Sequence, residues 1–62
     1  MKVREVIRLI EEHGWRFVAH KGSSHRQYKH PTLPGRVTIP GNLGDDIKPG
    51  TLASIYRQAG LK

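Results

Sequence analysis

The chain has 62 residues and a formal net charge of +6 at pH 7. A chain this short buries only about 60% of the surface that it exposes when unfolded, so it forms one small core without an enclosed cavity, and any site is an open surface suited to a large ligand. The absence of cysteine and of any long apolar run excludes disulfide frameworks, thiolate zinc sites and a membrane span, and we expect one domain over residues 1–62, in the cytoplasm.

An amphipathic helix is predicted over about residues 2–13. Its apolar side chains recur at the spacing i, i+3, i+4, i+7, which places them on one helix face. Charged residues occupy the other face, and Gly14 follows as a residue that can take the left-handed conformation at a helix end. The apolar positions are Val3, Val6, Ile7 and Ile10.

Three strands are predicted next, over Trp15–His20, Ser24–His30 and Arg36–Ile39, with a turn at 21–24 and a loop from Pro40 to Gly44. In the first strand, alternation places Trp15, Phe17 and Ala19 on one face. Since so small a domain needs its large apolar groups, we expect Trp15, Phe17 and Tyr28 to pack in the core.

A second helix is predicted to begin between Asp46 and Thr51 and to end at Gly60, because apolar side chains again recur at helical spacing. Short connections favour an antiparallel meander of the three strands. The predicted fold is therefore α+β, in the order helix, three-stranded antiparallel sheet, helix. Both helices carry one apolar stripe and should cover the same sheet face, leaving the other face to basic side chains. The helical stripe consists of Leu52, Ile55, Tyr56 and Ala59.

Positive charge is concentrated in the middle of the chain. Residues 13–44 contain no Asp or Glu and contribute a charge of +5. A one-sided basic surface is typical of nucleic-acid binding, and the alternative is a solvated basic surface that serves solubility. A salt titration separates the two, because binding to phosphates weakens as salt rises.

His20, His25 and His30 are five residues apart, a spacing that resembles a metal site. An odd separation along a strand puts side chains on opposite faces, and no cysteine or nearby carboxylate completes a ligand set, so no metal is expected. His25 follows a glycine-containing turn and lies among cations, which disfavour the protonated imidazole and favour a proton acceptor. The alternative is a surface histidine that only contacts phosphate, or one with a structural role.

The run from Gly22 to Pro31, Gly-Ser-Ser-His-Arg-Gln-Tyr-Lys-His-Pro, resembles the histidine motif of the HicA family of toxin ribonucleases. The segments 34–40, 47–52 and 58–61 continue the resemblance in order over nearly the whole chain. The resemblance implies a fold like the double-stranded-RNA-binding domain, cleavage of mRNA, and neutralisation by a HicB-type antitoxin. It assigns the catalytic histidine to His25, and Arg26 stands where many members have a second histidine.

The implied mechanism is metal-independent, without a cofactor, with His25 as the general base on a ribose 2′-OH. Cationic side chains would stabilise the phosphorane. On a regular strand Lys29 shares a face with His25 and Arg26 does not, which favours Lys29 as the direct aid. The expected nucleic-acid-binding residues are Lys21, Gly22, Ser24, Arg26, Lys29, Arg36 and Lys48.

Two readings of another class remain open: a non-catalytic RNA-binding module with the same fold, and an inert subunit for complex assembly or operator binding. Detection of RNA fragments ending in 2′,3′-cyclic phosphate separates the toxin from the module. We expect the free toxin to be a monomer and the antitoxin to cover the basic face beside His25.

Overall fold

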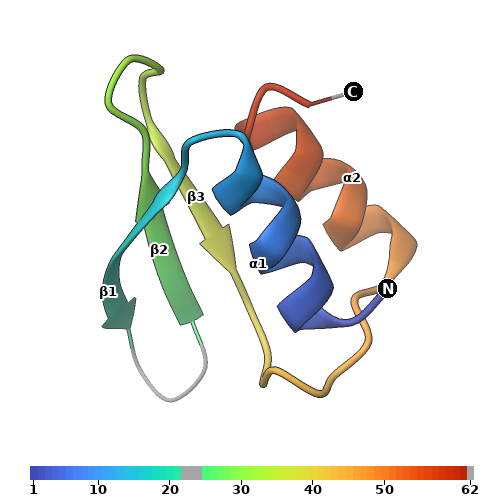
Figure 1. Cartoon of the computed structure of the whole chain (residues 1–62). Helices are drawn as coiled ribbons and strands as arrows, with labels where there is room; N and C mark the ends of the chain where they lie inside the picture. The colour runs from blue at the N-terminus through green and yellow to red at the C-terminus, as the bar shows by residue number, and fades with distance from the viewer. Residues whose placement is uncertain (22–24, 62) are drawn as a thin grey trace.

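The computed structural model describes residues 1–21 and 25–61. The chain order of its elements is helix, three strands, helix (Figure 1). This order confirms the predicted α+β fold, and α2 begins inside the interval expected for it. The elements are α1 (Val3–Glu12), β1 (Arg16–Lys21), β2 (His25–Lys29), β3 (Arg36–Ile39) and α2 (Pro49–Gln58).

The strands form one antiparallel sheet in the order β1-β2-β3. Tyr28 pairs with Phe17 in β1 and with Val37 in β3. Residues directly opposite one another share a sheet face, so these three lie on the same side. The register shifts between Phe17 and Ala19, and Ala19 pairs with Gln27. The prediction that Ala19 shares a face with Phe17 is therefore wrong, because the irregularity breaks the simple alternation of β1.

Both helices pack on the sheet face that carries Tyr28 and Val37 (Figure 1). Trp15 is fully buried, as expected, and its indole Nε1–H donates to the carbonyl oxygen of Ala59 at 3.2 Å. That bond joins the start of β1 to the end of α2. The core contains Val3, Val6, Ile10, Trp15, Tyr28, Val37, Ile39, Ile47, Ile55 and Ala59.

Phe17 is not a core residue, and the prediction that it is buried is wrong. Its side chain is 54% exposed, and its ring meets that of Tyr28 edge to face with centroids 5.8 Å apart. Phe17 stays exposed because its strand, β1, is the edge of the sheet that lies farther from the helices. The helices lie toward the β3 side of the sheet, where Gln58 of α2 accepts a hydrogen bond from the Thr38 N–H at 3.1 Å, and β1 is the far edge (Figure 1).

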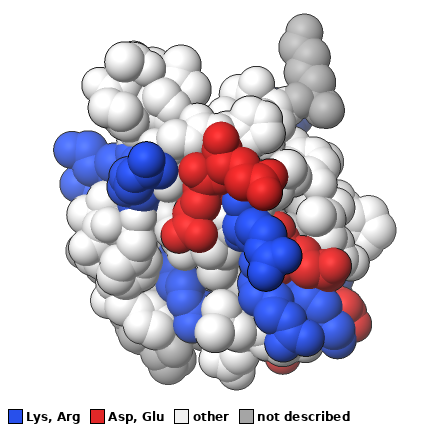
Figure 2. Space-filling model, viewed as in Figure 1, with Lys and Arg blue, Asp and Glu red and all other residues white. Residues whose placement is uncertain are grey.

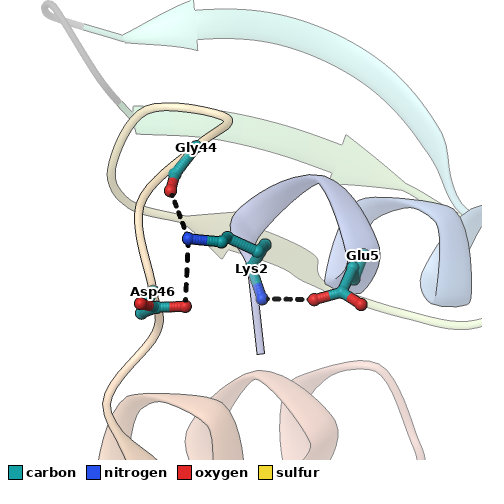
Figure 3. A network of polar contacts seen from close by, with 4 residues as sticks. All are labelled: Lys2, Glu5, Gly44 and Asp46. Atoms are coloured by element: carbon teal, nitrogen blue, oxygen red, sulfur yellow. Dashed lines mark hydrogen bonds and ion pairs between the residues drawn. The ribbon is translucent and has the colours of Figure 1, made fainter.

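The N-terminus holds the loop that precedes α2 (Figure 3). The Lys2 ammonium donates to the carbonyl oxygen of Gly44 at 3.2 Å and lies 3.6 Å from the Asp46 carboxylate. The Lys2 backbone N–H donates to the carboxylate of Glu5 at 2.7 Å, which caps α1. These contacts place Asp46 on the helix side of the molecule, away from the uncovered sheet face.

Candidate nucleic-acid interface

The sheet face opposite the helices is called the open face. Because Tyr28 faces the core, its neighbours Gln27 and Lys29 in β2 face the other way. The register then adds the residues that pair with them. By this register the described members of the open face are His25, Gln27 and Lys29 of β2, Arg16 and Ala19 of β1, and Arg36 and Thr38 of β3.

His25 is the first residue of β2 and is exposed. Its backbone pairs with that of Lys21 in β1. His25 and Lys29 share the open face, four residues apart, which is about 13 Å along a strand. Among the described residues no hydrogen bond engages the imidazole of His25.

Three cations lie in one row across the sheet, because Lys29 pairs with both Arg16 and Arg36. Like charges directly opposite one another destabilise a sheet, so stability does not favour this arrangement. The Arg16 guanidinium donates to the carbonyl oxygens of Glu11 and Trp15 at 3.4 and 3.3 Å, at the rim of the sheet. Lys29 and Arg36 are exposed.

Arg36 is held against Gln27. Its Nη1–H donates to the Gln27 side-chain oxygen at 2.8 Å. Gln27 lies midway between His25 and Lys29 on the same strand face. Sequence reasoning missed Gln27, although the alternation that selected Lys29 also selects the residue two after His25.

Arg26 lies on the face of β2 opposite His25, where alternation predicted it. It pairs with Ile39, and its Nη1–H donates to the carbonyl oxygen of Gly41 at 2.9 Å in a half-buried position. The guanidinium therefore supports the loop that follows β3.

Lys48, another expected binding residue, does not lie on the open face with His25. Lys48 precedes α2 and lines a shallow hollow together with Asp45, Asp46 and Thr51. Gly22 and Ser24 lie outside the described residues.

The remaining histidines are separated from His25. His20 pairs with Arg26 and so lies on the helix side of the sheet plane. His13 contacts the carbonyl oxygen of Leu9 through Nδ1 at 2.9 Å, at the end of α1. His30 lies beside Trp15, with ring centroids 5.2 Å apart. Within residues 1–21 and 25–61 no group of three His, Asp or Glu side chains is placed to hold a metal ion.

Acidic side chains belong to the helix side. Glu5, Glu11 and Glu12 lie on α1, and Asp45 and Asp46 lie in the loop before α2. Figure 2 shows the molecule with α1 in front, where acidic and basic side chains are interleaved. The strands contain no acid, so no carboxylate of the sheet itself offsets the cations of the open face.

An exposed imidazole that shares a sheet face with cations, on strands without carboxylates, has the chemistry to contact a phosphodiester and to accept a proton. The fold and the site thus define a small α+β protein with one sheet face that carries basic side chains. Residues 3–61 match the family described as HicA toxin of bacterial toxin-antitoxin. Because this match covers nearly the whole chain, the chain belongs to that family, which confirms the resemblance seen in the sequence.

A search of curated proteins found no match. The family makes the chain a toxin of a toxin–antitoxin pair, and such toxins are generally endoribonucleases that cleave mRNA. Its membership also implies an antitoxin partner and an RNA target. In the part of the chain that the structure describes, neither helix has the length and apolar character needed to cross a membrane.

Proposed function

We propose that the protein is a metal-independent endoribonuclease with His25 as its general base. The observation that carries the proposal is the exposed imidazole on the same sheet face as Lys29 and Arg36. In the proposed step His25 takes the proton of a ribose 2′-OH, and the 2′-oxygen attacks the adjacent phosphorus. The bond from phosphorus to the 5′-oxygen breaks, and that oxygen takes a proton. The products are a 2′,3′-cyclic phosphate and a 5′-hydroxyl end.

Lys29 and Arg36 would bind the RNA backbone and stabilise the charge that develops on the phosphorane. They are suited to this role because no carboxylate of the strands competes for them. Lys21, Gly22 and Ser24 precede His25 within four residues of the chain and would contact the nucleotide at the cleaved bond. Lys48, which is exposed at the start of α2, would add to the general attraction of RNA.

We expect a HicB-type antitoxin to neutralise the toxin by covering the open face. A partner surface rich in Asp and Glu would match the cations in charge and would exclude RNA from His25.

A non-catalytic RNA-binding module is the second candidate, and Arg26 favours it. Arg26 occupies the place of the second histidine of many family members, and its guanidinium is engaged with Gly41 on the other side of the sheet. The open face then offers a single imidazole. Such a module would bind RNA through the same cations without breaking the chain.

The test is incubation of the purified protein with single-stranded RNA, with and without EDTA. We expect fragments that end in 2′,3′-cyclic phosphate, in equal yield under both conditions. Intact RNA that is nonetheless bound would favour the module. Loss of cleavage in EDTA would contradict the metal-independent mechanism.

A further inference from the structure

The contact between Arg36 and Gln27 is a cross-strand pair on the open face. The Arg36 Nη1–H donates to Gln27 Oε1 at 2.8 Å, from β3 to β2. Gln27 directly opposes Thr38, and Arg36 directly opposes Lys29, so the pair runs diagonally. Because of this diagonal hydrogen bond, the Arg36 guanidinium lies toward Gln27, on the His25 side of Lys29 along β2.

This pair also fixes which way the amide of Gln27 is turned. A guanidinium has only donors, so the atom of Gln27 that faces Arg36 must be the oxygen. The amide NH₂ group is then left to point elsewhere, with two donors. The guanidinium keeps its other N–H groups as well. The middle of the open face therefore offers hydrogen-bond donors and positive charge, which is the chemistry that recognises a phosphate.

We propose that Gln27 is a positioning residue that holds the Arg36 guanidinium between His25 and Lys29, where the guanidinium binds a backbone phosphate of single-stranded RNA. The choice of RNA as ligand depends on the proposed function, whereas the pairing itself does not. A long, flexible arginine loses rotamer freedom when it binds an anion. Gln27 already restricts the guanidinium in the free protein, so less conformational entropy is lost when the phosphate binds.

A double-mutant cycle tests the proposal by measuring binding alone. All variants carry His25→Ala, so that the RNA stays intact, and the affinity for a single-stranded RNA oligonucleotide is measured over a range of salt concentrations. The parent is compared with Gln27→Ala, Arg36→Ala and the double variant. Arg8→Ala, on the exposed face of α1, is the matched control for the loss of one positive charge.

We expect Arg36→Ala to weaken binding about tenfold and to lower the log–log salt slope by about 0.7, the value for one lost phosphate contact on a single strand. Gln27→Ala should also lower the salt slope, although it removes no charge, because Arg36 is no longer held at the phosphate. In the Arg36→Ala background, Gln27→Ala should weaken binding by less than about twofold. Arg8→Ala should leave the affinity within about twofold of the parent.

Independent, multiplying effects of the two substitutions would overturn the proposal, as would an unchanged salt slope in Gln27→Ala. Gln27→Thr provides a second variant that favours the strand, in case Gln27→Ala does not fold. Binding and cleavage have separate outcomes. If the protein that retains His25 leaves RNA intact, the proposed function is refuted. The binding cycle would still decide the role of Gln27. A parent that binds no RNA would refute the phosphate site itself.

Discussion

His30 joins the end of β2 to the end of α1, because its Nε2–H donates to the carbonyl oxygen of His13 at 2.9 Å. The tautomer follows from the other ring nitrogen. Nδ1 accepts hydrogen bonds from the backbone N–H groups of Thr32 and Leu33, both at 3.1 Å, so it carries no proton. The imidazole thus satisfies three backbone groups at once, and its role is structural.

Replacement of His30 by alanine should destabilise the protein by about 2 kcal/mol, because several hydrogen bonds to the backbone are lost. Urea unfolding of the variant and the parent measures the difference in the free energy of unfolding. A His13→Ala variant serves as a control, since the carbonyl oxygen that accepts from His30 belongs to the backbone and is retained. An unchanged stability of His30→Ala would contradict the structural role.

Gly14→Ala should be more destabilising than Gly35→Ala, although both glycines have positive φ, at +97° and +80°. A Cβ at Gly14 would lie 2.6 Å from His30 Nε2, whereas a Cβ at Gly35 would meet no atom within 4 Å. Backbone strain of about 1–2 kcal/mol is common to both variants, and the excess at Gly14 measures the clash. The excess should shrink in a His30→Ala background, and persistence of the full excess there would show that His30 is not its cause.

His25→Ala should abolish RNA cleavage and leave the thermal unfolding midpoint nearly unchanged, because the side chain is exposed and lies outside the core. His20→Ala is the matched control. His20 is exposed as well, but it pairs with Arg26 and lies on the other side of the sheet, so cleavage should continue at the rate of the parent. Full cleavage by His25→Ala would remove this residue from the mechanism.

Arg26 and Lys29 should respond differently to replacement by alanine. Arg26→Ala removes the hydrogen bond to Gly41 and should lower the free energy of unfolding by about 1 kcal/mol. Lys29→Ala removes an exposed charge from the open face and should weaken RNA binding about tenfold without a change in stability. Calorimetry and a binding titration of both variants check this. The reverse assignment of the two effects would show that Arg26 is the residue that contacts RNA.

Stability should fall in alkaline solution because of Tyr28. Burial raises the pKa of Tyr28 above its ordinary value of 10.0, the negative charge of Glu11 raises it further, and Arg26 opposes the shift. The folded protein thus holds the phenol proton more tightly than the unfolded chain does. This contribution to stability is fully present below about pH 10 and is lost as the pH rises through the folded pKa.

Tyr28→Phe should make the alkaline loss of stability smaller. The urea midpoint of Tyr28→Phe and of the parent, measured at neutral pH and about one unit above the ordinary tyrosine pKa, checks the expectation. Tyr56→Phe is the control, because that hydroxyl contacts Met1 at 3.3 Å outside the core and the variant should keep the loss seen in the parent. An equal alkaline loss in Tyr28→Phe would contradict the assignment to Tyr28.

Local patterns in the sequence were enough to predict the order of elements and the strand faces on which several candidate site residues lie. The apolar spacing in residues 3–10 predicted α1, and alternation in β2 placed His25 and Lys29 on one face and Arg26 and Tyr28 on the other. These inferences succeed because helix and strand geometry fix where side chains point along a single element. The basic, acid-free segment likewise predicted an open face with positive charge.

Only the tertiary structure decided which residues meet across elements. The exposure of Phe17 depends on how far the helices extend over the sheet, and the change of face at Ala19 depends on a register shift between β1 and β2. The bond between Arg36 and Gln27 requires the register of β2 against β3. Pairing register and helix coverage arise from packing between segments far apart in the chain, and the pattern within one strand does not contain them.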